Sequence, residues 1–206
     1  MDKNREDELE ALATANGWAF SIEGEENPLE TLPFTFFTNG VAHSAFNIIQ
    51  GSVRDRGFLE FDYDWETLVG GLFSVAESIE SSCAVTALAG VCPELMVSHE
   101  TTSHWLEHPF THEVFESERE EFARRFRVST TDAAFAATIL DPAMEQWLLD
   151  SLSDTDLCFE IQGSWLLCFT HLRPPAEVPA VIDGLVSFYE HIPSAAIDAL
   201  PDPADA

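Results

Sequence analysis

Basic side chains are scarce in this sequence. Nine lysines and arginines stand against 37 aspartates and glutamates, Lys3 is the single lysine, and the formal net charge of the 206-residue chain is −28 at pH 7. Proteins that bind polyanions displace counterions with lysine and arginine, and an excess of carboxylates repels phosphates at long range. We therefore expect neither nucleic acid nor an anionic membrane surface as a partner.

Long apolar runs are also missing. The longest uncharged apolar stretch lies near Leu68–Ala76, far short of the roughly 20 residues that cross a bilayer as a helix. The segment Met1–Glu10 is rich in charge and lacks the apolar centre of a secretory signal. These two observations predict a cytoplasmic protein without a membrane span.

Known catalytic motifs are absent as well. The sequence contains no GxSxG elbow, glycine-rich phosphate loop, dinucleotide fingerprint or HExxH pattern, so we predict no catalytic residue and no cofactor. Its four cysteines are too far apart for CxxC pairs, and buried free thiols are expected. Cys158 and Cys168 flank a predicted hairpin and could face each other, but a reducing compartment argues against a disulfide.

Hydrophobic residues, by contrast, are plentiful. They make up 46% of the chain and include sixteen phenylalanines and five tryptophans, enough apolar surface to form a core and offset the entropy of ordering the chain. We expect a single α+β domain over residues 1–193, followed by a flexible tail over residues 194–206.

Strands are predicted mainly as hairpins. The first joins Ala45–Val53 to Phe58–Trp65, with Gly57 supplying the positive φ of the turn. The second joins Leu157–Gln162 to Trp165–Thr170 around Gly163-Ser164. Further strands are expected at Trp18–Glu23, Cys83–Ala89, Leu95–His99 and Phe122–Val128. Residues 70–82 are expected to form an irregular connection before Cys83.

Helices are predicted near the amino terminus and in the second half of the chain. Arg5–Asn16 ends at Gly17, which suits a left-handed turn. Ser129, Thr130 and Thr131 offer N-caps for a helix near Asp132–Leu140. Asp141-Pro142 ends that helix and starts the next, with Asp141 at the cap, and the last helix covers Glu177–Ile192. Hairpins combined with clustered helices predict an antiparallel sheet with the helices packed on one face, not a parallel doubly wound sheet.

Three stretches carry a resemblance to a known family: Asn47–Tyr63, Phe126–Leu149 and Phe159–Pro193. They contain a glycine-bounded hairpin that ends in an aromatic-acidic strand, an F-x-V strand, an Asp-Pro helix junction and a helix that closes at Ile-Pro. In this order of elements the chain resembles an uncharacterised bacterial, mainly actinobacterial, protein family. The resemblance implies structural elements only and assigns no catalytic residue.

Alternating acidic residues form the first candidate site. Leu59, Phe61, Tyr63 and Trp65 should face the core, and the residues between them should point the other way: Glu60, Asp62, Asp64 and Glu66. Carboxylates about 7 Å apart along a strand cannot alone supply the six to eight oxygens of a calcium site. We expect a solvated face, with cross-strand ion pairs or metal binding as alternatives.

Arginines form the one basic cluster. Arg125 and Arg127 share a face of the predicted strand Phe122–Val128, so they could pair with the acidic strand if the two are neighbours. An anion-binding site built from the cluster Arg119, Arg124, Arg125 and Arg127 is the alternative. Arg125 and Arg127 are also candidate interaction residues.

Histidines are concentrated between residues 99 and 113. His108 and His112 have the i, i+4 spacing of two metal ligands on a helix, although Pro109 between them allows this only in a first turn. The candidate metal ligands are His104, His108, His112 and Glu113, with His99 nearby; a loop of exposed histidines is the simpler interpretation. Trp105 is a candidate interaction residue in the same loop.

Three functional hypotheses follow. The absence of catalytic motifs favours a non-enzymatic interaction module that binds another protein through an aromatic and apolar surface patch. A metal-dependent hydrolase using the 99–112 loop is the first alternative. The second is a mimic of a polyanion, which requires a continuous band of carboxylates on one rigid face.

Overall fold

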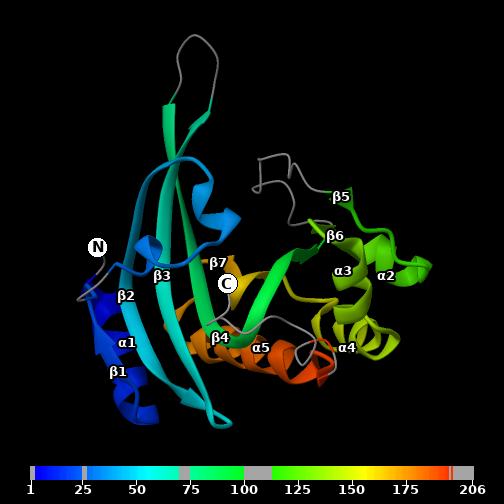
Figure 1. The fold of residues 1–206 in the computed structure, drawn as a ribbon. Coiled ribbons are helices and arrows are strands. Elements are labelled where there is room, and N and C mark those ends of the chain that lie inside the picture. The colour runs from blue at the N-terminus through cyan, green and yellow to red at the C-terminus, as the bar shows by residue number, and fades with distance from the viewer. Residues whose placement is uncertain (1–2, 25–26, 70–74, 100–112, 195, 197–206) are drawn as a thin grey trace.

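A computed structural model describes residues 3–24, 27–69, 75–99, 113–194 and 196. These residues form one antiparallel sheet of seven strands, in the order β1-β2-β3-β4-β6-β5 with β7 paired to β4 (Figure 1). The strands are β1 (Ala19–Ser21), β2 (Val41–Val53), β3 (Arg56–Val69), β4 (Val75–His99), β5 (Glu113–Val114), β6 (Phe126–Thr130) and β7 (Cys158–His171). The predicted antiparallel α+β class is confirmed.

The β2–β3 hairpin is confirmed, but its turn differs from the prediction. Positive φ angles fall on Arg54 (50°) and Asp55 (61°), and Gly57 is not among the residues with positive φ. Two consecutive left-handed residues match the right-handed twist of the flanking strands. The turn therefore consists of Arg54 and Asp55. The residues on either side of it, Val53 and Arg56, pair with each other.

β4 is one continuous strand, where we predicted an irregular connection followed by two strands. Its first part, Val75–Val85, pairs with β3, and its last part pairs with both β6 and β7. The residues around Glu77 and Glu80 are small or acidic and carry no strand pattern, yet pairing with the preceding strand β3 makes them a strand.

The predicted hairpin around Gly163 is also wrong. Residues 158–171 form the single strand β7, both halves of which pair with β4. Gly163 has a φ of 56° and lies at an irregularity in that pairing. This glycine therefore marks a bulge and not a reversal of the chain.

Five α-helices lie in the described parts of the chain, with bounds close to most of those predicted: α1 (Lys3–Asn16), α2 (Glu120–Arg125), α3 (Ala133–Ile139), α4 (Pro142–Leu152) and α5 (Val178–His191). Asp132 and Asp141 cap α3 and α4 by accepting two backbone N–H bonds each. The described residues also include three short 3₁₀ helices: η1 (Pro28–Glu30), η2 (Thr35–Thr38) and η4 (Pro175–Glu177). No helix in these described ranges is long and apolar enough to cross a membrane.

α2 replaces the first half of the strand predicted at Phe122–Val128. Phe122 and Phe126 stack with ring centroids 5.0 Å apart. Their separation of four residues fits one turn of helix as well as alternate positions of a strand, so the sequence pattern was ambiguous. Arg125 is consequently the last residue of α2, and Arg127 lies in β6.

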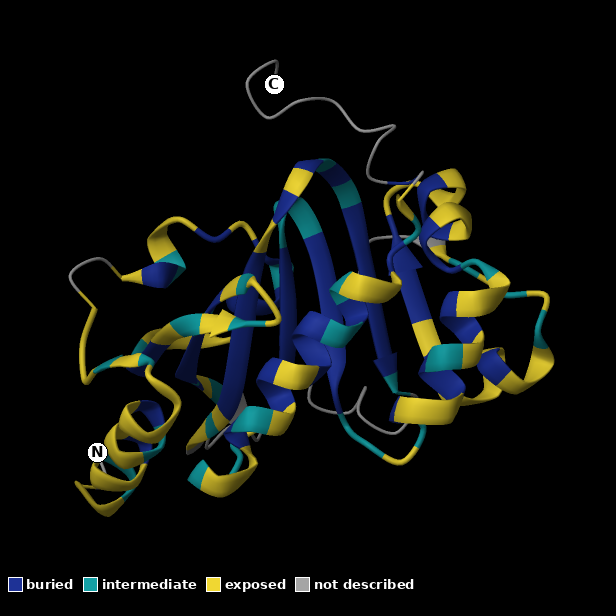
Figure 2. Cartoon of the chain, turned by 90° about the horizontal axis from the view of Figure 1, so that it is seen from below, coloured by how far each residue is buried: buried dark blue, intermediate teal, exposed yellow. Residues whose placement is uncertain are grey.

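The sheet has two differently covered faces (Figure 2). The helices pack on one face, around a core that includes Leu9 of α1, Leu148 of α4 and Leu185 of α5; this confirms the prediction of helices on one face. The segment 27–40, which carries η1 and η2, packs on the other face, here called the loop face. Ala196 is buried against the helix-face core, while residue 195 and residues 197–206 of the predicted tail lie outside the described ranges.

All four cysteines are buried and remain thiols without a disulfide bond, as predicted. Cys158 and Cys168 lie ten residues apart along β7, so they do not face each other across a hairpin. Burial raises the pKa of the Cys92 thiol to about 12 and raises the pKa of Cys83 and Cys168 well above the ordinary value. These thiols are packing groups and not activated nucleophiles.

Candidate functional site

The aromatic row of β3 faces the segment 27–40, as its alternation predicts. Phe36 of η2 packs against Tyr63 and Trp65 with centroid distances of 5.5 and 5.4 Å, and it stacks on Phe169 of β7 at 4.0 Å. All four rings are buried. Aromatic contacts of this kind add to the free energy gained by burying the rings, so they hold η2 on the loop face.

Two buried glutamates fix the same segment by hydrogen bonds. Glu160 of β7 accepts bonds from the backbone N–H groups of Thr35 (2.7 Å) and Phe36 (3.1 Å), and Glu94 of β4 accepts one from the Thr35 hydroxyl (2.8 Å). Burial raises the pKa of Glu160 to about 8; the two backbone N–H bonds oppose this shift and nearby Glu94 adds to it. The carboxyl groups therefore position the covering segment.

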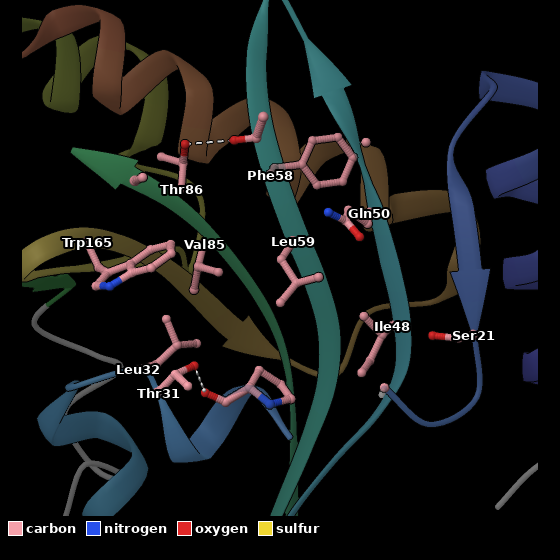
Figure 3. Close-up of a pocket in the computed structure, with 15 residues that line it drawn as sticks. Ser21, Thr31, Leu32, Ile48, Gln50, Phe58, Leu59, Val85, Thr86 and Trp165 are labelled. Atoms are coloured by element: carbon pink, nitrogen blue, oxygen red, sulfur yellow. Dashed lines mark hydrogen bonds between the residues drawn. The ribbon is translucent and has the colours of Figure 1, made fainter. Parts of the chain in front are cut away.

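A groove of about 870 Å³ opens on the loop face beside η1. Its floor comes from neighbouring strands, with Ile48 on β2, Leu59 on β3, Val85 on β4 and Trp165 on β7, and Leu32 from the covering segment points toward them (Figure 3). Four polar side chains border it: Ser21, Thr31, Gln50 and Thr86. We call this the uncharged groove.

None of the fifteen residues that line the uncharged groove carries a charge, although charged residues make up 22% of the chain. Thr86 uses its hydroxyl to donate to the backbone carbonyl of Gly57, and Thr31 donates to that of Pro28. Gln50 is exposed, and its amide makes no side-chain hydrogen bond within the described part of the chain. The lining offers apolar contact and neutral hydrogen bonding, and no group suited to acid–base chemistry or to ion binding.

The acidic row of β3 is not the solvated face that we predicted. Glu60 and Asp62 are 0% and 1% exposed, whereas Asp64 is half-buried and Glu66 is exposed. The reason is that α1 and α5 cover this side of the sheet. The row therefore divides into a buried half and an outer half.

Asp62 is neutralised by α1 and not by the predicted arginine cluster. Arg5 donates to both carboxylate oxygens of Asp62, from Nε at 2.7 Å and from a terminal nitrogen at 2.6 Å, and Asn47 adds a third bond at 2.8 Å. Glu60 has two buried oxygens without a partner in the described structure. Desolvation, followed by the charge of Asp62, raises its pKa well above the ordinary value, with Arg5 opposing the shift. Burial therefore favours the neutral form of the Glu60 carboxyl group.

The arginine prediction is wrong in its geometry. Arg125 makes a 3.9 Å ion pair with Glu121 on its own helix, and both side chains are largely exposed. Arg127 is exposed on β6, which pairs with β4 and β5 and not with β3. The two arginines therefore neither share a strand face nor contact the acidic row.

Most of the histidine loop lies outside the described residues, including His104, Trp105, His108 and His112. Glu113 is the first residue of β5, and His99 ends β4, where its Nε2 lies 3.1 Å from the Ser153 carbonyl oxygen. Among the residues that are described, no group of three histidines, cysteines or acids is arranged to hold a metal ion. The metal-site prediction remains a prediction.

Sequence reasoning did not find the uncharged groove. Leu59 was expected to face the core and Trp165 was placed only as the first residue of a strand, and both are partly buried. The lining comes from segments separated by up to 144 positions, from Ser21 to Trp165. The signal that could have indicated it is the lack of charge from Phe46 to Val53 in so acidic a chain.

No protein-family model matches the chain, and no curated protein matches it. One solved structure is similar: the mycobacterial trehalose monomycolate transport factor A, TtfA, with a TM-score of 0.66, 13% sequence identity and 98% coverage of both chains. At this identity the likeness extends to the fold, along nearly the whole length of each chain.

Proposed function

We propose that this protein is a non-catalytic protein-interaction module, and that the uncharged groove holds an uncharged, partly apolar segment of another protein. The observation that carries the proposal is the composition of the groove: fifteen lining residues without one charge, in a chain with a net charge of −28. Apolar surface removed from water contributes about 25 cal/mol per Å². An uncharged lining also avoids the cost of desolvating an ion on binding.

The polar border suits a peptide. The hydroxyl of Ser21 and the amide of Gln50 can each donate and accept hydrogen bonds, as the N–H and C=O groups of a bound main chain require. The similar structure is named as a transport factor and not as an enzyme, which supports a binding role. The buried positions of Glu60 and Asp62 interrupt the carboxylate row that a polyanion mimic would use.

Peptide selection with a charged groove variant tests this proposal. A displayed library would be selected against the wild-type chain at about 0.15 M salt, where screening limits charge attraction to about 8 Å. Ala87, exposed in β4, lines the groove, and Ala87→Glu would place a carboxylate in it. We expect uncharged apolar peptides to be enriched, and Ala87→Glu to weaken their binding at least about tenfold, the effect of about 1.4 kcal/mol.

Val114→Glu is the matched control, because Val114 is an apolar strand residue that is 56% exposed and lies outside the groove. It should leave the affinity of the selected peptides unchanged. Equal effects of Ala87→Glu and Val114→Glu, or failure to enrich any uncharged peptide, would contradict the proposal. Thermal unfolding of both variants would establish that each is folded.

A further inference from the structure

A second cavity, of about 640 Å³, lies where β2 extends beyond its pairing with β1. Its lining includes Glu23, which lies between β1 and η1, and Arg5 of α1. It also includes His43 and Asn47 of β2, Asp64 of β3 and Glu80 of β4. β1 pairs only with Ile48–Gln50 of β2, so Val41–Asn47 has no strand partner on that side within the described residues. We call this cavity the acceptor pocket.

The donors of its buried and partly buried side chains, Arg5 and Asn47, are already occupied. Arg5 uses Nε and one terminal nitrogen on Asp62 and the other terminal nitrogen on the Arg173 carbonyl oxygen at 2.6 Å. The Asn47 side-chain nitrogen donates to Asp62 at 2.8 Å. The His43 ring is 2.8 Å from the Tyr63 hydroxyl. The Arg5 charge is also compensated by Asp62.

Its acceptors are free. Asn47 is 2% exposed, and its side-chain oxygen has no hydrogen-bond partner in the described structure; Oδ1 of Asp64 is buried and likewise without one. The carboxylates of Glu23 and Glu80 are exposed at the same cavity. Buried oxygens without donors are costly, so a ligand that supplies donors and positive charge would gain from both features.

We propose that the acceptor pocket binds a guanidinium group, presented as an arginine side chain of a partner protein. A guanidinium offers five N–H donors in one plane and is always charged, so it can serve the Asn47 and Asp64 oxygens and the outer carboxylates together. A metal ion fits less well, because the described residues contain no group of three ligands arranged for one.

Charge favours a protein as the source. The net charge of −28 attracts basic surfaces from a distance and raises their rate of encounter. The pocket shares only Gly24 with the uncharged groove, whose lining includes neither Asn47 nor Asp64. The proposal therefore does not depend on the function proposed for that groove.

Titration of the full chain with a short peptide tests the proposal. The probe is acetyl-Gly-Arg-Gly-amide, followed by NMR through the side-chain amide of Asn47. We expect chemical-shift changes that saturate with a dissociation constant of about 1 mM. The same peptide with citrulline in place of arginine is uncharged and nearly isosteric, and it should bind at least roughly tenfold more weakly, as expected for loss of a charged hydrogen bond.

Two charge-matched variants separate the pocket from the overall field of the protein. Asp64→Asn removes one charge inside the pocket, and Glu118→Gln removes one at an exposed position outside it. Binding should weaken at least roughly tenfold in the first and remain unchanged in the second. Equal weakening in both variants, equal binding of citrulline, or the absence of saturable shifts would overturn the proposal.

A third arm identifies the source of the guanidinium. Methylguanidinium alone should bind more weakly than the arginine peptide, since the flanking main chain contributes contacts in a protein-binding site. Equal affinities of the two probes would overturn the assignment to a protein partner. Unchanged thermal unfolding of Asp64→Asn would exclude misfolding as the cause of a weaker signal.

Discussion

Replacing Glu160 with glutamine should change how the stability of the protein depends on pH. Glu160 is buried and its carboxyl group holds η2 through the backbone N–H groups of Thr35 and Phe36. Its pKa is raised to about 8 from 4.5. Between these two values the folded state binds a proton that the unfolded state releases.

The sign follows from this difference in bound protons. The contribution of Glu160 to stability is greatest below pH 4.5 and is lost as the pH rises through about 8. Between pH 4.5 and about 8 the folded state holds one more proton than the unfolded state. The free energy of unfolding therefore falls by about 1.4 kcal/mol per pH unit in this range. A glutamine at position 160 is neutral in both states and lacks this dependence.

Urea unfolding followed by tryptophan fluorescence, at about pH 5.5, 6.5 and 7.5, measures the effect. At the lowest pH the Glu160→Gln variant should be less stable by about 1–3 kcal/mol, because its amide nitrogen cannot accept from a backbone N–H. The difference between wild type and variant should then fall by about 1.4 kcal/mol per pH unit. Glu118→Gln, at an exposed position, serves as control. A constant difference across the range would refute the reasoning and show that Glu160 is ionised in the folded protein.

Three other substitutions test the helix face of the sheet by the same unfolding measurement. Glu60→Met should stabilise the protein by about 1–3 kcal/mol at pH 7, since it removes two buried oxygens without partners; lower stability would contradict a neutral, unbonded Glu60. Arg5→Met should destabilise by about 3–5 kcal/mol, because the buried carboxylate with which it pairs loses its countercharge; an unchanged midpoint would mean that the pair contributes nothing. Gly51→Ala should lower the melting temperature, since an added Cβ would lie 2.3 Å from the Trp18 ring, whereas Gly57→Ala meets nothing within 4 Å and serves as its control.

Local signals predicted the helices well because helix capping and helix periodicity lie within a few residues of each other. Asp141 caps α4 as expected, whereas α3 is capped by Asp132 and not by Ser129, Thr130 or Thr131. Gly17 has the left-handed φ of 72° expected at the end of α1. The β2–β3 hairpin was predicted for the same reason, since its two strands are adjacent in sequence. Most contacts of short range were therefore accessible from the sequence alone. The exception is the pairing of β3 with the start of β4, where the small and acidic residues near Glu77 and Glu80 carry no strand pattern.

Contacts of long range were not accessible. The continuous course of β7 past Gly163 depends on pairing with β4, where Gly163 lies opposite Cys92, 71 positions away. Burial of Asp62 depends on Arg5, 57 positions away. An alternating acidic strand normally indicates a solvated face, and here the covering helix and its arginine reverse that outcome.

The distribution of charge separates the two proposed sites, and salt should distinguish them. The uncharged groove has no ionisable lining residue, whereas Glu23, Asp64 and Glu80 line the acceptor pocket. Raising the salt from about 0.05 M to about 0.5 M shortens the range of exposed charges to a few ångströms. It should weaken the arginine peptide several-fold and leave the affinity of uncharged groove peptides unchanged.

If the acidity of the chain served solubility alone, salt would affect both peptides equally and Asp64→Asn would be silent. Arginine binding that is weakened by salt and by Asp64→Asn, but not by Glu118→Gln, would instead show that part of the net charge of −28 serves recognition. Oxygens that are buried without partners at Asn47 and Asp64 make this the expected result, because solubility requires carboxylates that face water and gains nothing from acceptors hidden from it.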